Sequence, residues 1–234
     1  MKLIYLRSAA LSISAAPAAA QDSTEAAATP TATADAAPAA VPAAVPSTEP
    51  ACELHIWPAE RFQAMTTGWL GGGLLDAAIH ADGDKARRSQ MASALDREGQ
   101  LDALQKLDLL TLLKLPASKI VTHDEALDRK TVNKILTRRS DSHAACYSEL
   151  IVTDVLYTKA AMWGRSLRTS FILRQFGAGG TPSIKKTTGG NGLKIFPAKK
   201  GEDTTAADAE LVSIFQKNFT EAAENFAKQT GSTS

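Results

Sequence analysis

Alternating and β-branched patterns predict several strands along the chain. Residues 146–159 (CYSELIVTDVLYTK) and 166–176 (SLRTSFILRQF) are rich in β-branched and aromatic residues, a composition that favours strands. A short segment with Gly164 joins them, which predicts an antiparallel hairpin. The segments 53–58 (ELHIWP) and 118–124 (SKIVTHD) predict two further strands.

Helical spacing of apolar residues is clearest near the C-terminus. Residues 205–228 place five apolar side chains on one face, which predicts a helix docked on a core: Leu211, Phe215, Phe219, Ala222 and Phe226. Leucines at helical spacing also predict a helix over 100–115, which Pro116 ends.

The segment after the first strand predicts three helices with breaks between them. Pro58 ends the strand and suits the first turn of a helix over 59–67. A second helix is expected over 70–81, where Asp82-Gly83 breaks it, and a third over 84–96.

Four glycines in GWLGGG (68–73) match no phosphate-binding loop. Leu-Leu-Asp follows Gly73 where a Walker loop needs a lysine, and the spacing of the dinucleotide fingerprint is missing. Only fourteen uncharged residues separate Arg61 from Asp76, fewer than the roughly 18 that a membrane span needs. We therefore expect residues 66–88 to be structural, with Gly72 at a close contact between two helices; a membrane-active segment is the alternative.

Glycine and charge patterns complete the expected order of elements. Residues 127–139 predict a basic helix that starts at Asp128, and the glycine-rich residues 177–192 predict a loop. GLKIFP (192–197) predicts a last short strand. This order predicts an α/β or α+β fold, with a small, mainly antiparallel sheet covered by several helices and a docked C-terminal helix.

The N-terminal fifty residues have the composition of an exported leader and a spacer. Residues 1–20 combine Lys2 and Arg7 with a short apolar stretch and an Ala-Ala-Ala cleavage site, which predicts a signal peptide. An uncleaved membrane tether is the less favoured alternative. Residues 21–50 consist mainly of Ala, Pro and Thr, and we expect a disordered or semi-rigid spacer. Residues 51–234 fit a single α/β domain.

Charge argues against nucleic acid as a partner. The chain has 26 Lys and Arg and 25 Asp and Glu; two of the basic and four of the acidic residues precede residue 51, which leaves 24 against 21 in the domain. The basic residues are dispersed, so we expect a solvated mixed surface and no nucleic-acid binding.

The two cysteines predict a disulfide. In an oxidising compartment Cys52 and Cys146 are expected to pair, and two buried reduced thiols are the alternative. Neither cysteine lies in a nucleophile motif. The serines near Cys146 form no GxSxG elbow, so we expect no catalytic residue.

Two weaker candidate sites remain. His80, Asp82, Asp84 and His123 offer imidazole and carboxylate ligands that suit zinc or manganese, although their spacing matches no tight metal signature. We therefore expect neither a metal nor a cofactor. Arg138 and Arg139 could bind an anion, whereas the alternative is a helix C-terminus that these cations complement.

Three segments resemble a family of exported proteins of unknown function from Gram-negative bacteria. They are CELHIWPAERFQAMTTGWLGGGLLDAA, LDRKTVNKILTRRSDSHAACYSELIVTDVLY and WGRSLRTSFILRQFG. The likeness extends over nearly all of 51–228, and the family implies no known activity. More distantly, the order of elements is similar to the small α/β domain of the curli-secretion and penicillin-binding-protein-activator lipoproteins. The chain departs from these lipoproteins because no cysteine directly follows its leader.

These observations favour a non-catalytic exported protein of the cell envelope, periplasmic or secreted. It would be an interaction module on a flexible spacer, with an envelope protein or a cell-wall polymer as partner and no transmembrane span in the mature chain. The alternative is a metal-dependent periplasmic hydrolase that uses His80, Asp82, Asp84 and His123. The sequence does not decide whether the protein is an enzyme.

Overall fold

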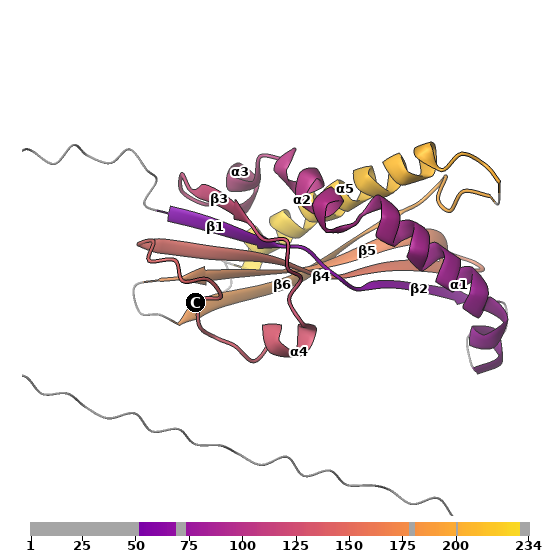
Figure 1. The fold of residues 1–234 in the computed structure, drawn as a ribbon, viewed down its shortest axis with the longest axis horizontal. Coiled ribbons are helices and arrows are strands. Elements are labelled where there is room, and N and C mark those ends of the chain that lie inside the picture. Colours follow the sequence, from indigo (N-terminus) through magenta and orange to yellow (C-terminus); the bar gives the residue numbers. More distant parts are fainter. Residues whose placement is uncertain (1–51, 69–73, 178–180, 200, 230–234) are drawn as a thin grey trace, which may run out of the picture. The chain divides into compact units, whose positions relative to one another are not determined.

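A long antiparallel hairpin forms the centre of the fold in the computed structural model (Figure 1). Its strands are β4 (Cys146–Ala160) and β5 (Gly164–Phe176), so the predicted hairpin is confirmed. The structure describes residues 52–68, 74–177, 181–199 and 201–229. All of them fall in one compact unit of the chain, 47–234.

Four more strands complete a mixed sheet. They are β1 (Cys52–Trp57), β2 (Phe62–Thr67), β3 (Lys119–Thr122) and β6 (Pro182–Gly192). The strand order is β3-β1-β4-β5-β6, and β2 also lies beside β4. The β1–β3, β1–β4 and β2–β4 pairs are parallel, whereas β4–β5 and β5–β6 are antiparallel. The predicted α/β class is therefore confirmed, with a sheet that is mixed.

β1 and β2 share one edge of β4. Cys52–Trp57 pairs with the first part of β4 and Phe62–Thr67 with the second, where a register shift between Val152 and Asp154 separates them. Pro58 interrupts the ladder because it has no N–H to donate. The prediction of a helix over 59–67 is wrong. β4 extends beyond its pairing with β1, and β2 pairs with the part of β4 that β1 does not reach.

The predictions for 177–192 and 192–197 are also wrong. Residues 182–192 form β6, and residues 193–197 are not a strand. A Cβ at Gly189 would lie 2.1 Å from the carbonyl oxygen of Asn218. Glycine at this position therefore lets the backbone of the C-terminal helix pack directly against β6. The N–H groups of residues 194–196 donate to the carboxylate of Glu210.

Four of the five described helices cover one face of this sheet (Figure 1). They are α1 (Leu74–Ala94), α2 (Arg97–Gln105), α3 (Leu109–Leu113) and α5 (Thr205–Gln229). The five apolar side chains predicted to dock the C-terminal helix are at most 1 % exposed. That helix is confirmed.

The helix boundaries differ from the sequence predictions for identifiable reasons. α1 continues through Gly83, because the adjacent Asp84 binds Thr66 of β2 and the missing Cβ leaves room for Arg87. Asp108 caps α3 by accepting from the N–H of Thr111, which divides the predicted 100–115 helix into two.

Only Arg129–Val132 of the predicted 127–139 helix is helical, and it forms the single turn of α4. Gly72 and its neighbours lie outside the described residues, so the close helix contact expected there stays a prediction. No helix in the described ranges has the length and hydropathy to cross a bilayer.

Candidate functional site

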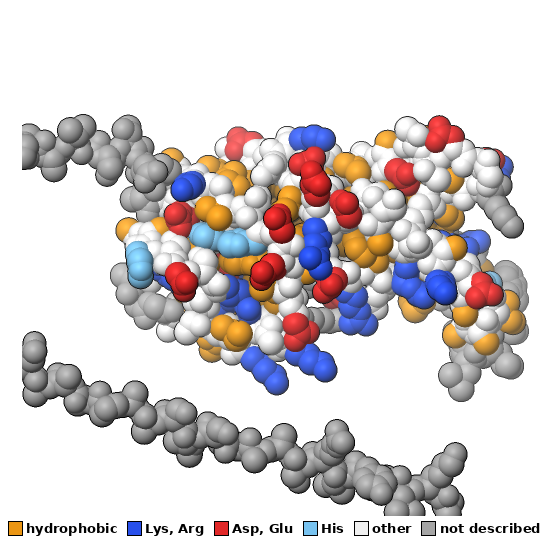
Figure 2. Space-filling model, in the orientation of Figure 1, with side chains coloured by type: hydrophobic (Ala, Val, Ile, Leu, Met, Phe, Trp, Pro, Cys, Tyr) orange, Lys and Arg blue, Asp and Glu red, His pale blue; other side chains and the backbone are white. Residues whose placement is uncertain are grey.

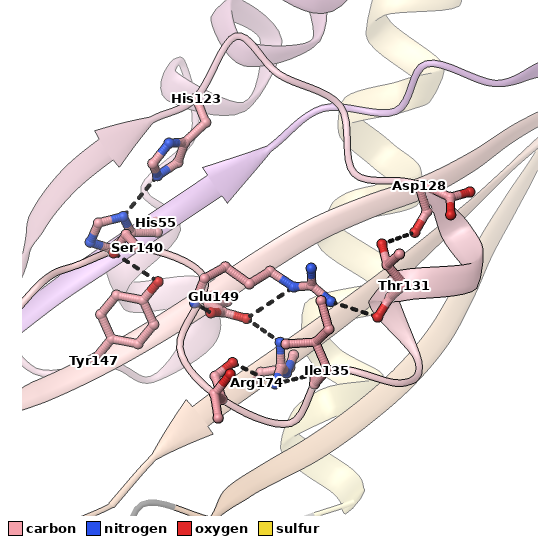
Figure 3. Close-up of polar contacts among 11 residues, drawn as sticks. His55, His123, Asp128, Thr131, Ile135, Ser140, Tyr147, Glu149 and Arg174 are labelled. Carbon is pink, nitrogen blue, oxygen red and sulfur yellow. Dashed lines mark hydrogen bonds and ion pairs between the residues drawn. The ribbon is translucent and has the colours of Figure 1, made fainter. Parts of the chain in front are cut away.

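One irregular segment covers part of the sheet face opposite the four helices. We call residues 123–145, which connect β3 to β4 and include α4, the strap (Figure 3). Val132 and Leu127 of the strap pack on Trp57, Ile151 and Ile172, and these residues form a second apolar cluster apart from the main core. The strap therefore has its own packing against the sheet.

A buried ion cluster fastens the strap to the hairpin. Glu149 and Arg174 lie opposite each other on β4 and β5, and Nη1 of Arg174 donates to the Glu149 carboxylate over 2.6 Å. Their side chains are 0 % and 1 % exposed. The N–H of Arg139 donates to the other carboxylate oxygen over 2.9 Å. Full burial makes this pairing essential, because a lone charge here would lack solvent.

The same guanidiniums supply partners for carbonyl groups of the strap (Figure 3). Nη2 of Arg174 donates to the carbonyls of Ile135 and Thr137, at 2.9 and 3.2 Å. Arg139 donates to the carbonyl of Thr131 over 3.0 Å. Backbone carbonyls that lie outside a helix or a sheet still need hydrogen-bond donors. In the strap, arginine side chains donate the hydrogen bonds that a helix or strand would otherwise provide.

Both arginines of the predicted anion-binding pair donate hydrogen bonds to backbone carbonyls of the strap. Arg138 donates to the carbonyls of Ser142 and Ala144, both over 3.0 Å, and its guanidinium lies 5.0 Å from the ring centre of Tyr147. Burial, followed by the charge of Arg174, lowers the pKa of Arg139. Binding of an external anion by Arg138 and Arg139 stays a prediction, and it would compete with these carbonyls.

A chain of polar side chains lies at the other end of the strap. The Ser142 hydroxyl donates to the Glu53 carboxylate, which accepts from Nε2 of His55 over 3.0 Å. Nδ1 of His55 lies 2.8 Å from Nε2 of His123. A neutral His55 that donates to Glu53 must accept at Nδ1, so His123 is then the donor.

Packing and charge favour the neutral form of His123. The ring of His123 stacks on Trp57 with 4.1 Å between ring centres. Burial lowers the pKa of His123 and the nearby His55 adds to the effect, while Glu125 and Asp124 oppose it. Hydrogen bonds from Ser142 and then His55 hold the pKa of Glu53 below its usual range.

This arrangement does not activate a nucleophile. A catalytic serine needs a base with a high affinity for its proton, whereas Ser142 donates to the Glu53 carboxylate, whose lowered pKa makes it a weak base. Burial raises the pKa of Tyr147 to about 12, and the hydroxyl of Tyr147 accepts from Ser140. These hydrogen-bonded side chains therefore serve to position the strap.

The four metal-ligand candidates are not brought together. The Asp84 carboxylate accepts hydrogen bonds from the N–H and hydroxyl of Thr66 and from Nη1 of Arg87. His123, by contrast, faces His55. His80 and Asp82 lie on α1. Within the described ranges, no group of three or more His, Cys, Asp or Glu side chains could hold a metal ion. This geometry gives no support to the hydrolase alternative.

The expected disulfide lies close to the contacts between Glu53, His55 and His123. Cys52 and Cys146 are register partners on the parallel strands β1 and β4, with their Cα atoms 4.6 Å apart, and they are bonded. The bond joins residues 94 positions apart and precedes Glu53 and Tyr147 directly. It therefore ties the start of β1 to the end of the strap.

The part of this sheet face that the strap leaves uncovered is lined with polar side chains. Three depressions of about 640, 300 and 370 Å³ adjoin one another, since each shares lining residues with the next. The residues that line the three depressions include Arg61, Asn133, Thr153, Asp154, Ser170 and Thr188. We call this surface the uncovered face.

Sequence reasoning missed the uncovered face and the histidine pair. Alternation within β5 and β6 was a signal for the first, because it places Ser170 and Thr188 on one side of adjacent strands. The second depends on strand order: β1 and β3 pair in parallel, and the N–H of His123 donates to the carbonyl of Ile56.

Comparisons with known proteins add no functional assignment. No family model matches the chain, and no curated protein matches its sequence. The hypothetical protein CT253 from Chlamydia trachomatis is similar over 74 % of this chain and 94 % of its own, with 10 % identity and a TM-score of 0.32.

Protein XCC0632 from Xanthomonas campestris, of family DUF330, is similar over 81 % of this chain and 94 % of its own. Its identity is 12 % and its TM-score 0.33. At these scores the likenesses carry no inference about function. The distant resemblance to curli-secretion and penicillin-binding-protein-activator lipoproteins stays a prediction.

Proposed function

We propose that this protein is a non-catalytic, exported component of the cell envelope that binds another envelope protein through its uncovered face. The observation that carries the proposal is the unequal covering of the sheet. Four helices bury one face, whereas the strap covers only part of the other and leaves three adjoining depressions. A sheet face of this kind offers a shaped, polar surface for a partner.

The character of the uncovered face favours a protein over a cell-wall polymer. It mixes acidic groups such as Asp154 with basic groups such as Lys186, and hydroxyls such as Ser170 and Thr188 lie between them. Sugar polymers are usually held against exposed aromatic rings, and the residues that line the depressions contribute only the buried Phe171. Figure 2 shows that acidic and basic side chains are also interspersed over the molecular surface in that view.

Export is supported by two observations. The Cys52–Cys146 disulfide is a bond that persists in oxidising compartments. Residues 1–20 have the pattern of a signal peptide, and residues 21–50 would then separate the domain from the site of cleavage or tethering. A spacer of this composition lets a folded module search for its partner.

Site-specific photo-crosslinking in intact cells tests the proposal. A photoreactive residue at the exposed Thr188, on the uncovered face, should yield a discrete adduct with a second protein, whereas one at the exposed Ser213, on α5, should not. Ser170→Arg places a long side chain in the depressions and should abolish the adduct, while Ser213→Arg should leave it unchanged. Equal adducts at both positions, or sedimentation with purified cell wall and no protein adduct, would contradict a protein partner on this face.

A further inference from the structure

The tip of the β4–β5 hairpin carries two apolar side chains that project into solvent. Met162 is 81 % exposed and Trp163 is 89 % exposed. Three residues form the turn, and Gly164 follows with a φ of 73°. A Cβ at Gly164 would meet no atom within 4 Å, so the backbone conformation of the turn, and not packing, requires glycine here.

Other exposed apolar side chains lie at the same end of the sheet. Met65 of β2 is 53 % exposed, and its register partner is Thr158, close to the end of β4. Ile195 is 52 % exposed, and its carbonyl accepts from Arg165 at the start of β5. Figure 2 shows apolar, basic and acidic side chains next to one another at the right-hand end of the molecule.

The hairpin itself is positively charged near this tip. The hairpin has four basic and no acidic residues between positions 155 and 175, and only Arg174 among them is buried in an ion pair. Lys159 and Arg165 are register partners directly behind the turn. The guanidinium of Arg165 donates to the carbonyls of residues 194–196, so Arg165 contributes its positive charge, while the exposed Lys159 is the cation placed to contact a phosphate. Glu210 is the carboxylate that contacts the neighbouring 194–196 segment, and it is occupied by three backbone N–H groups.

We propose that the hairpin tip binds an anionic lipid surface. Trp163 and Met162 enter the headgroup region, Lys159 lies at the level of the lipid phosphates, and Arg165 adds its positive charge on the neighbouring strand. Tryptophan prefers this depth because its ring is apolar and its N–H is polar, and long basic side chains reach back toward the charged headgroups. Two apolar residues with two flanking cations give reversible surface binding of the kind that depends on anionic lipid.

The shape of the tip favours lipid over a protein partner. A protein that accepts a projecting tryptophan must provide a pocket matched to it, whereas a bilayer deforms around any convex apolar tip. The cations flank the tip on both strands, which suits headgroups on every side. This site lies at the hairpin turn and does not depend on the partner proposed for the uncovered face.

Vesicle flotation tests the proposal with the exported form of the full chain. The protein should float with vesicles of phosphatidylglycerol and phosphatidylethanolamine but not with phosphatidylcholine vesicles. Trp163→Ala should weaken binding roughly tenfold or more, the loss expected when a buried tryptophan is removed. Lys159→Glu should also weaken it. Leu136→Ala, at a side chain of the strap that is 54 % exposed, is the matched control and should bind normally.

A fluorescence measurement reports lipid contact directly. Brominated acyl chains in the anionic vesicles should quench part of the tryptophan emission, and Trp163→Phe should remove that part while the melting curve stays unchanged. A wild-type protein that does not bind, or a Trp163→Ala variant that binds as well as wild type, would overturn the proposal. Loss of a protein partner from Trp163→Ala without any vesicle binding would reassign the tip to a protein interface.

Discussion

Glu149 of β4 and Arg174 of β5 face each other across the central hairpin and form a buried ion pair of 2.6 Å. The pair lies beneath the strap, and Arg174 also binds two of its carbonyls. Neither charge reaches solvent, so each depends on the other and on the strap for its partners. The pair therefore couples the stability of the hairpin to the position of residues 123–145.

Removing one charge of this pair should destabilise the domain strongly. Glu149→Gln leaves the guanidinium of Arg174 buried without its carboxylate, and we expect a loss of about 3–5 kcal/mol in the free energy of unfolding. Urea denaturation measures it. The control is Glu60→Gln, because Glu60 pairs with Arg97 at the surface, where exposed ion pairs contribute about 0–1 kcal/mol. Similar small losses in both variants would show that the buried pair does not hold the fold.

The disulfide should be present in exported protein and should contribute to stability. Intact mass after alkylation without reductant should show no modified thiol at Cys52 or Cys146. Closing a loop of 94 positions contributes at most about 4–5 kcal/mol if its effect is entropic, so reduction should lower the urea midpoint clearly. Two freely alkylated thiols in unreduced protein would contradict the bond.

Local pattern predicted those elements whose residues carry the whole signal. The hairpin and the C-terminal helix were predictable because their apolar periodicity is strong on its own. β2 was not, since Phe62–Thr67 becomes a strand only through the free edge of β4. The continuity of α1 depends on the contact of Asp84 with Thr66, a partner eighteen residues away.

The same division holds for the candidate site. Spacing identified Arg139 as one of a basic pair, but its bond to the carbonyl of Thr131 follows from the path of the strap. The sequence offers His123 as a metal-ligand candidate, whereas strand order places its side chain against His55. Side chains that meet through a sheet need the topology before their partners can be named.

A glycine at a close backbone contact should tolerate no larger side chain. The contact expected at Gly72 falls outside the described residues, but Gly189 presents one between β6 and α5. Its substitution by alanine would place a Cβ 2.1 Å from the Asn218 carbonyl oxygen, and we expect a loss of about 1–3 kcal/mol or more.

The neighbouring Gly190 is the matched control for this change. A Cβ there would meet the flexible Arg168 side chain at 3.4 Å, so Gly190→Ala should have a much smaller effect on the thermal melting curve. Equal melting temperatures for the two variants would mean that the helix moves away from the strand at little cost.

Deleting residues 21–50 should leave the stability of the domain unchanged. The segment is composed mainly of Ala, Pro and Thr and has no apolar face to pack on the described elements. Melting curves of residues 21–234 and of residues 51–234 should superimpose. A large drop in melting temperature on truncation would reveal that the spacer docks on the domain.

Acid should destabilise the protein partly through His123, which contacts His55 at one end of the strap. Burial holds the pKa of His123 below its ordinary value of about 6.5, so the unfolded chain binds more protons than the folded one as pH falls past that value. Stability from His123 is therefore complete above about pH 7 and is lost progressively below about pH 6.5. Glu53, whose pKa is also lowered, adds a further loss at lower pH, below its ordinary value of about 4.3.

A matched pair of variants separates the contribution of His123 from general acid denaturation. His123→Gln removes the titrating group, so its free energy of unfolding should change less than that of wild type between about pH 7 and pH 5, a range that brackets the ordinary histidine pKa. The exposed His143, also in the strap, provides the control, and His143→Gln should follow the wild-type slope. Urea denaturation at a series of pH values measures all three slopes. If His123→Gln loses stability as steeply as wild type, the acid sensitivity does not come from this imidazole, because a missing group cannot take up the proton that the argument requires.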